Sequence, residues 1–288
     1  DNCPPDLHRS LTKICSQQNS NVSLLTVEYE VREDIPDETN VFMLEPASEE
    51  LIEKLIHKRY PHISQVNANT IAHFSGGNAR IAIALANTVK RNETLSDFSD
   101  DELFNRLFWQ NQAPDENLLL SAEVCSLVYS FEGEDTYSEK SELNFLASLI
   151  NKTGEELYRN ISLLRERNLV QSRSVWRAIL PHAIANRLAK RALNSIPKDT
   201  LIQTFLNYGS ERIIKSFSKR LSYLHDCKPA VEVANKWLAP DGVLGKENCN
   251  FNQLGMELFN NIAPVSPEKT LITIEQAANN EKDNFFFS

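Results

Sequence analysis

The sequence contains no loop of the form G-x-x-x-x-G-K-[ST], in which backbone N–H groups cradle nucleotide phosphates. Glycine is scarce, with 8 residues in 288, and a single glycine precedes a lysine. That pair, Gly245-Lys246, lacks a glycine at the required spacing and is followed by glutamate instead of serine or threonine. This chain alone is therefore not expected to hydrolyse ATP.

Cysteines are few and scattered along the sequence. The five are Cys3, Cys15, Cys125, Cys227 and Cys249. Their odd number and the absence of any C-x-x-C pair argue against a disulfide framework and against a zinc site. We expect reduced thiols and a cytoplasmic protein. No apolar run approaches the roughly 18 residues that span a bilayer, so no membrane partner is expected.

The charge balance disfavours two kinds of partner. The formal net charge is −9, which disfavours non-specific binding to nucleic acid or to an anionic membrane. The hydrophobic content of 41% is that of an ordinary globular protein, and 288 residues suit about two domains or several small ones. The opening DNCPPDLHRS has no methionine and no signal-like segment, so we expect a piece of a longer protein.

Residues 1–45 predict one helix followed by two strands. Leu7, Leu11 and Ile14 recur at helical spacing after a proline pair. Apolar residues over 22–31 and over 40–44 predict two strands. These elements are too few for a domain, and we interpret them as the edge of an α/β sheet.

Residues 46–110 predict a small unit of four helices. The apolar spacing favours helices over residues 48–58, 64–74, 78–90 and 99–109. Ser48 is expected to cap the first helix, and Ser99 with Glu102 is typical of a capping box at the start of the last.

Residues 111–195 follow a different pattern. Helices are expected over 117–131, 141–150 and 153–168, and the two strands of a short hairpin over 169–173 and 175–180. Pro181 then opens another helix. Three helices followed by a two-stranded ribbon are typical of a winged helix-turn-helix.

Residues 196–288 predict paired helices without strands, which is typical of a helical repeat region, although no fixed period is visible. Helices are expected over 199–207, 210–224, 230–238, 251–262 and 267–277. The tail from residue 279 carries no pattern, and we expect it to fray. The chain as a whole is therefore predicted to be mainly α.

The stretch SGGNARIAIALA, residues 75–86, combines two of the scarce glycines with an arginine where a new helix begins. Glycines permit positive φ and a close backbone approach. A helix that starts there directs its free N–H groups and positive dipole end forward, and Arg80 adds a cation suited to phosphate. An anion is the expected ligand. The alternative is a plain helix–helix turn with Arg80 in solvent.

The order of these parts resembles the back half of the STAND NTPases, the AAA+-related signal-transduction ATPases that include NB-ARC immune receptors and bacterial antiviral proteins. Three stretches carry the resemblance, which covers about residues 1–195. DNCPPDLH resembles the end of a Walker B strand, SGGNARIAIALA resembles the lid motif (sensor 2), and ILPHAIANRLA resembles the winged-helix histidine motif. The bacterial antiviral proteins are the most similar subgroup.

The resemblance implies a nucleotide site shared among these parts. Asp1 would hold Mg²⁺ through water and serve the catalytic role of a Walker B acid. Asn2 stands where many AAA+ ATPases have the water-activating glutamate, which implies slow turnover. The residues implied to contact ATP or ADP are Gly77, Asn78 and Arg80 of the lid, Thr26 as sensor 1, and His182, which would contact the β-phosphate of ADP.

The implied function is that of the C-terminal part of a nucleotide-switched NTPase, in bacterial antiviral defence. The helical region would bind a protein trigger, and ATP would drive self-association of the parent protein. Two other classes remain open. One is a winged-helix regulator that binds DNA, although its third helix, residues 153–168, has equal numbers of arginines and glutamates. The other is a helical scaffold for partner proteins.

Overall fold

The computed structural model describes residues 5–17, 20–26, 42, 47–110, 112–167, 169–180, 182–247 and 249–286. Within these residues the chain is mainly helical, as predicted, and it contains one small three-stranded sheet. It divides into two units, Asp1–Ala47 and Ser48–Ser288. The finer boundaries near residues 110 and 195 stay predictions.

The first unit contains helix α1 (Pro5–Cys15), as the apolar spacing predicts. The strand expected from residue 22 is wrong over 22–26, where the backbone is irregular. A strand needs a neighbour to take up its backbone hydrogen bonds, and no other strand lies in the described residues of this unit. Residues 27–31 and most of the second predicted strand lie outside the described residues.

The second unit opens with four helices: α2 (Glu49–Arg59), α3 (Gln65–Ser75), α4 (Ala79–Ala86) and α5 (Asp100–Trp109). Ser48, Ser64 and Asn78 cap the first three through their side chains, and Ser99 and Glu102 form the predicted capping box on α5. Helix α4 ends at Ala86, four residues earlier than predicted, because Asn87 and Thr88 form a turn. Buried apolar residues from the four helices form a shared core.

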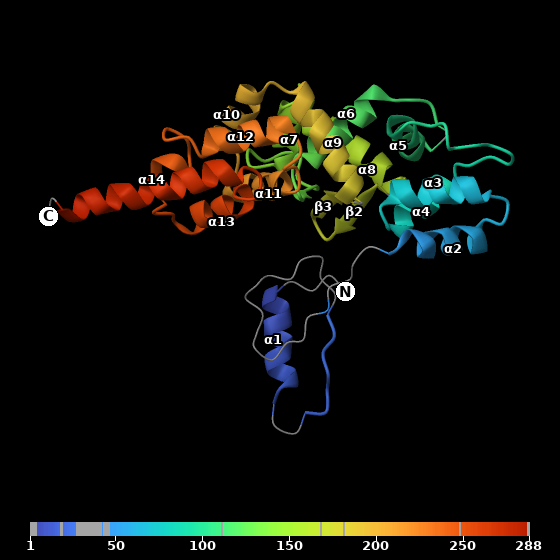
Figure 1. The fold of residues 1–288 in the computed structure, drawn as a ribbon, viewed down its shortest axis with the longest axis horizontal. Helices are drawn as coiled ribbons and strands as arrows, with labels where there is room; N and C mark the ends of the chain where they lie inside the picture. The colour runs from blue at the N-terminus through green and yellow to red at the C-terminus, as the bar shows by residue number, and fades with distance from the viewer. Residues whose placement is uncertain are drawn as a thin grey trace. The chain divides into compact units, whose positions relative to one another are not determined.

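Helices α6 (Glu116–Ser126), α7 (Glu142–Ser148) and α8 (Gly154–Glu166) follow, and the predicted hairpin forms from β2 (Val170–Arg173) and β3 (Trp176–Ile179). The sequence analysis missed β1 (Phe131–Glu132), which pairs antiparallel with β3 and places β3 in the centre of the sheet. Helix α9 (His182–Ser195) starts just beyond the hairpin and packs along α6 (Figure 1).

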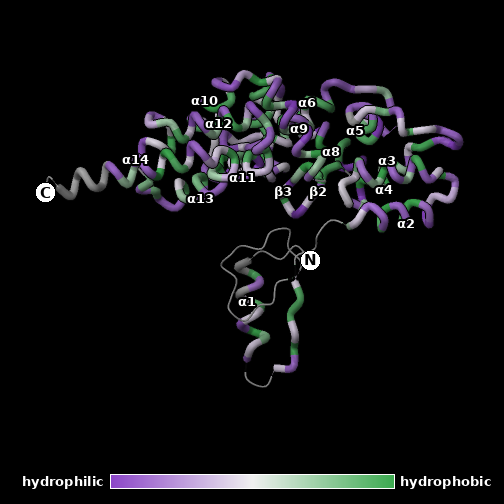
Figure 2. The backbone as a smooth tube through the Cα atoms, in the orientation of Figure 1, coloured by the Kyte–Doolittle hydropathy of each residue, from purple (hydrophilic) through white to green (hydrophobic). Residues whose placement is uncertain are grey.

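The remaining helices are α10 (Lys198–Tyr208), α11 (Glu211–Ser222), α12 (Lys228–Trp237), α13 (Gln253–Ile262) and α14 (Pro267–Phe286). Hydrophobic and hydrophilic residues alternate along them (Figure 2), and their core holds Phe217, stacked on Phe205 at 4.0 Å and edge-on to Trp237. The expectation that the tail frays from residue 279 is wrong, since α14 continues to Phe286. No glycine or proline interrupts that stretch.

The Gly245-Lys246 pair lies in a short 3₁₀ turn, Gly245–Glu247, between α12 and α13. A Cβ atom on Gly245 would lie 1.9 Å from the carbonyl oxygen of Ala239. This glycine is therefore explained by close backbone packing.

Helix α11 is bound to the sheet region through one ion pair. Arg212 of α11 donates to both carboxylate oxygens of Glu142, and one of its nitrogens also reaches the carbonyl oxygen of Ser130 at 3.2 Å. Glu142 in turn accepts the N–H of Glu132 at 2.6 Å. Beside this pair, Ser216 exchanges hydrogen bonds with Ser130. The segment before β1 is thereby bound to α11.

We predict that Glu142→Gln lowers the free energy of unfolding by about 1.5–3 kcal/mol, because it weakens a paired charge-assisted contact and leaves Arg212 without a counter-ion. Urea denaturation would measure the change. The matched control is Glu155→Gln, which removes an exposed ion pair with Arg159 and should leave the transition midpoint unchanged. Equal losses from the two variants would show that the Arg212–Glu142 pair has no special role.

Candidate functional site

The two glycines between α3 and α4 form a turn with positive φ, as the sequence predicts. Gly76 has φ 54° and Gly77 has φ 78°, both in the left-handed region that glycine adopts without strain. Gly76 ends α3, with its N–H donating to the carbonyl oxygen of His73. The turn places Asn78 at the start of α4 and leaves Arg80 exposed in its first turn.

Asn78 is the N-cap of α4. Its side-chain oxygen Oδ1 accepts from the backbone N–H groups of Arg80 at 3.0 Å and Ile81 at 3.2 Å. These two donors are satisfied within the chain, so fewer N–H groups face an anion than the sequence alone implies. The dipole of α4 and the Arg80 side chain still favour an anion there. Nucleotide contact by Gly77, Asn78 and Arg80 stays a prediction.

His182 is the first residue of α9 and lies in an aromatic stack. Its ring is parallel to that of Tyr129, with centroids 5.0 Å apart, and Tyr129 Oη lies 3.3 Å from His182 Nε2. The Tyr223 ring at the end of α11 lies parallel to both, 6.3 Å from that of His182. The stack therefore joins α9, α11 and the segment before β1.

The surroundings of His182 determine its charge. Burial, together with the nearby positive charge of Arg220, lowers the pKa of His182 from 6.5 to about 4. The imidazole is therefore neutral at pH 7. It would offer a bound phosphate an ordinary hydrogen bond, unless the phosphate itself raised the pKa of the ring.

Arg220, which the sequence analysis did not single out, is completely buried beside this stack. Its guanidinium lies 5.6 Å from the Tyr129 ring centroid, and Nη1 donates to Asn186 Oδ1 at 2.6 Å. Lys219 Nζ lies 4.5 Å from the same ring centroid. A Lys-Arg pair on an amphipathic helix normally faces solvent, so no sequence signal marks Arg220 as an interior cation.

The two predicted site residues of the first unit are described only in part. Thr26 Oγ1 lies 2.9 Å from His8 Nδ1, and His8 also contacts Thr12. The expectation that Thr26 lies on a strand is wrong, and its role as a sensor 1 residue stays a prediction. Asp1, the predicted Mg²⁺ and catalytic residue, lies outside the described residues.

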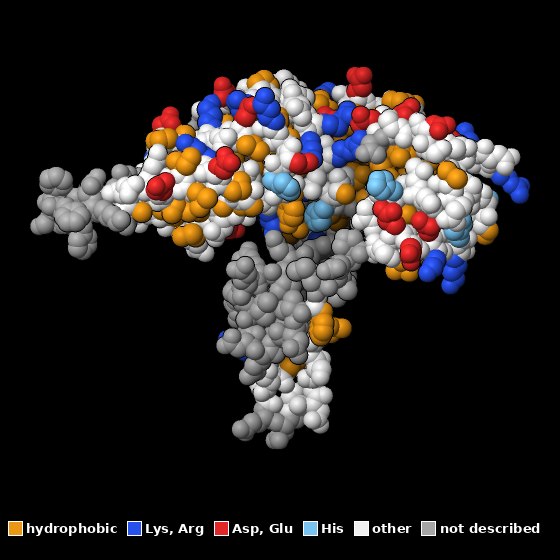
Figure 3. Space-filling model, viewed as in Figure 1, with side chains coloured by type: hydrophobic (Ala, Val, Ile, Leu, Met, Phe, Trp, Pro, Cys, Tyr) orange, Lys and Arg blue, Asp and Glu red, His pale blue; other side chains and the backbone are white. Residues whose placement is uncertain are grey.

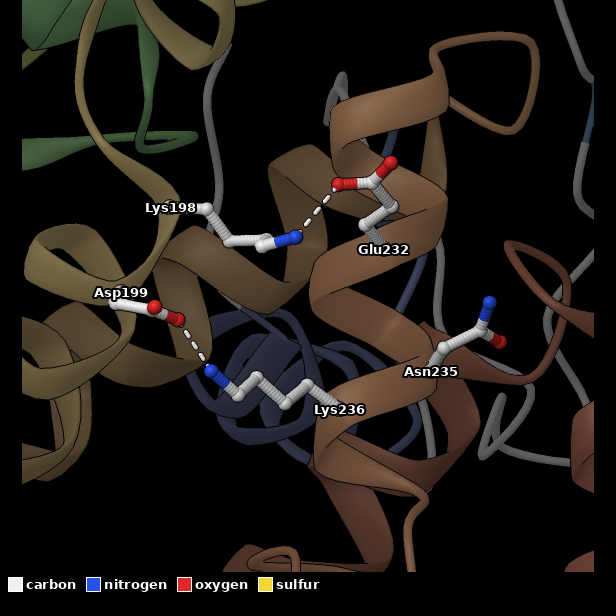
Figure 4. A pocket seen from close by; sticks show the side chains of 5 residues that line it. All are labelled: Lys198, Asp199, Glu232, Asn235 and Lys236. Atoms are coloured by element: carbon white, nitrogen blue, oxygen red, sulfur yellow. Dashed lines mark hydrogen bonds and ion pairs between the residues drawn. The ribbon is translucent and has the colours of Figure 1, made fainter.

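A shallow surface pocket lies between α10 and α12, far along the sequence from these residues (Figure 4). Two ion pairs cross it, Lys198 with Glu232 at 2.8 Å and Lys236 with Asp199, and Asn235 lines its edge. Each pair lowers the pKa of its carboxylate. Because the charges satisfy one another, this pocket has no strong preference for a charged ligand.

The structure thus brings Gly77, Asn78 and Arg80 into one turn, and it places His182 in a separate cluster with Arg220. In the described residues no three histidine, cysteine or acidic side chains gather as a metal site would require. No helix in that part of the chain is both long and apolar enough to cross a membrane. Comparison with family models, with curated proteins and with solved structures gave no significant match.

We predict that His182 makes the fold less stable in acid. Its folded-state pKa lies below the unfolded value, so the unfolded chain binds more protons between pH 6.5 and pH 4, and stability falls as pH is lowered through this range. In His182→Gln, urea unfolding at pH 7 and at the lower end of the range should differ less than in the unaltered protein. An unchanged difference would mean that His182 titrates normally.

Proposed function

We propose that this chain is the C-terminal part of a nucleotide-switched signal-transduction NTPase of the STAND type, acting in the bacterial cytoplasm. Residues 1–45 would belong to the nucleotide-binding domain, 46–110 to the lid, 111–195 to a winged helix and 196–288 to the region that binds a protein trigger. ATP and Mg²⁺ would bind in the intact parent. Asp1 would act there together with a phosphate loop in the parent protein, which this chain does not contain.

The order of the elements supports this proposal. Four packed helices precede three helices and an antiparallel hairpin, and further helices follow. The hairpin pairs antiparallel and β2 contacts α8, which supports the proposed roles of wing and third helix. The antiviral role rests on the resemblance of the sequence alone.

The observation that carries the proposal is the position of His182. It begins the helix that directly follows the hairpin, where the resemblance requires a histidine that contacts ADP. The ring lies parallel to those of Tyr129 and Tyr223, and the interior cation Arg220 is close enough to act on its charge. A positive charge beside the ring would favour an anion at this place, which supports the proposal.

The arginines that the DNA-binding alternative requires mostly contact other groups of the chain itself. Arg177 of β3 is buried and pairs with Glu134 at 2.9 Å. Arg159 of α8 pairs with Glu155, and Arg167 donates to the carbonyl oxygen of Phe108 near α5. A groove-binding surface requires cations that face phosphates. These arginines are therefore poorly placed for DNA.

One observation favours the scaffold alternative for residues 196–288. Hydrophobic side chains gather on the surface over α13 and α14 (Figure 3), where Met256, Leu271, Ile272 and Ile274 are exposed. Helix α14 buries Thr270 and Thr273 instead, and Thr273 Oγ1 donates to the carbonyl oxygen of Leu238. An apolar surface of this kind suits a protein partner, which is also what the STAND proposal assigns to this region.

We predict opposite effects of two substitutions in the longer parent. Arg80, on the lid, should contact the γ-phosphate and favour the ATP-bound, assembling state, so Arg80→Ala should reduce triggered assembly. His182 should hold the ADP-bound, closed state, so His182→Ala should increase assembly without a trigger. Loss of one hydrogen bond to a charged group costs ~1.5–3 kcal/mol, which shifts a two-state equilibrium roughly 10- to 100-fold.

Mass photometry of both variants, with and without nucleotide, measures this assembly. Exposed Arg159→Ala is a matched control, because its partner Glu155 is also exposed. A change of the same sign in both variants, or none in either, would contradict the assignment of these two residues.

We also predict that the chain does not bind duplex DNA tightly. With a net charge of −9 and its arginines paired internally, the dissociation constant should be weaker than about 1 µM at physiological salt. Fluorescence anisotropy over a range of salt concentrations measures it. Tighter, salt-sensitive binding that Arg159→Ala or Arg173→Ala weakens would support the DNA-binding alternative instead.

A further inference from the structure

Arg220 is the starting point, because it is a completely buried cation without a counter-ion. Among the residues that the structure describes, no carboxylate lies within ion-pair distance of its guanidinium. Other basic residues on α11, which carries Arg220, and on the neighbouring helix α9 do contact a carboxylate. They are Arg187, Lys190, Arg191, Arg212 and Lys215. The most buried cation of the set is thus the one that lacks an acid.

The hydrogen bonds of Arg220 are also incomplete. Nη1 donates to Asn186 Oδ1 at 2.6 Å, and Nη2 lies 3.5 Å from the carbonyl oxygen of Val128. Nε is buried and has no hydrogen-bond partner. A guanidinium offers five donors, and burying one unsatisfied beside an uncompensated charge is costly. Burial lowers the pKa of Arg220 only to about 10, so it stays charged at pH 7.

Other features around Arg220 also favour an anion. His182 stands at the N-terminus of α9, where the helix dipole is positive. Lys219 lies over the Tyr129 ring on the same side of α11 as Arg220. Exposure to solvent decreases from Tyr223 to Arg220. Tyr223 is 44% exposed, Tyr129 and His182 are partly buried, and Arg220 is fully buried.

We propose that Arg220 and His182 together bind a phosphate group, at a site formed by α9 and α11 beside the Tyr129 ring. The phosphate supplies the missing counter-charge and accepts the unused Nε–H of Arg220 in a charge-assisted bond. It would enter from the side of Tyr223, the most exposed of the three aromatic rings. That the phosphate belongs to ADP rests on the proposed function; the pairing of Arg220 with a phosphate does not.

This site has a consequence for coupling. Arg220 belongs to α11, in the helical region, whereas His182 belongs to α9, which follows the hairpin. A phosphate held by both residues ties the two helices together, and its loss releases them. A trigger bound to the helical region and a nucleotide at His182 therefore act on the same contact, in both directions.

The test follows the ring resonances of His182 by NMR in this chain labelled at histidine, with His182→Gln to assign them. Pyrophosphate and ADP are titrated separately at pH 7. We expect pyrophosphate to shift the resonances with millimolar affinity. Arg220→Met should weaken that affinity at least about tenfold, as expected for one lost charge-assisted bond. Lys215→Met, on the same helix but paired with Glu257, should bind as the unaltered protein does.

A second variant keeps the side-chain size of the site. Asn186→Asp places a carboxylate where Arg220 Nη1 now donates to an amide oxygen. It should give Arg220 an internal counter-ion, raise the melting temperature and abolish the pyrophosphate shift. Because it does not remove the buried arginine, it also covers the case in which Arg220→Met fails to fold.

The outcomes separate the two proposals. Equal pyrophosphate affinity in the unaltered protein and in both variants, or no shift of His182 with either ligand, overturns the role of Arg220. A response to pyrophosphate that needs Arg220, without any response to ADP, supports the phosphate site and contradicts the nucleotide assignment of His182. A response to ADP that is the same in Arg220→Met supports the nucleotide assignment and overturns the phosphate site proposed here.

Discussion

The ion pair between Arg212 and Glu142 fixes the geometry on which the candidate site depends. It binds α11 to the segment before β1, and the neighbouring exchange of hydrogen bonds between Ser216 and Ser130 fixes the register. Tyr129 lies in that segment, one residue from Ser130 and on the Arg220 side of the helix. The attachment thereby helps to keep the Tyr129 ring close both to His182 and to the buried guanidinium.

The attachment explains how a cation can be kept in the interior without an acid. The Tyr129 ring, the Asn186 amide and the Val128 carbonyl each offer partial negative charge, which together replace only part of the hydration that Arg220 loses. Burial, assisted by the same positive charge, lowers the pKa of His182 and keeps the imidazole neutral at pH 7. The cluster is thus under electrostatic strain that a phosphate would relieve, and this is the physical basis for regarding it as part of a switch.

Local features of the fold could be predicted from the sequence, because they depend on neighbours a few residues apart. The capping box at Ser99 and the glycine turn at Gly76-Gly77 are of this kind. Strand β1 was missed because two residues carry no periodicity and gain their partners only when β3 arrives from far along the chain. Tertiary contacts outweighed local preference there.

The candidate site was predictable only in part for the same reason. His182 and Asn78 stand in stretches whose order resembles a family, so the sequence could mark them. Arg220 gives no such signal, because burial of a cation depends on what packs over α11 and not on the residues beside it. The helical tail shows the opposite case, since a stretch without an apolar stripe still continues as α14 when no glycine or proline interrupts it.

The central proposal is that one bound nucleotide is contacted at two places, the start of α4 and the start of α9. Hydrogen exchange of the longer parent in its ADP- and ATP-bound forms tests this most directly, because a ligand that binds at the start of a helix stabilises the first turn and slows the exchange of its amides. The account predicts slower exchange over residues 182–185 with ADP than with ATP, and over residues 78–81 with ATP than with ADP. Exchange at both helix starts that does not depend on the nucleotide would contradict it.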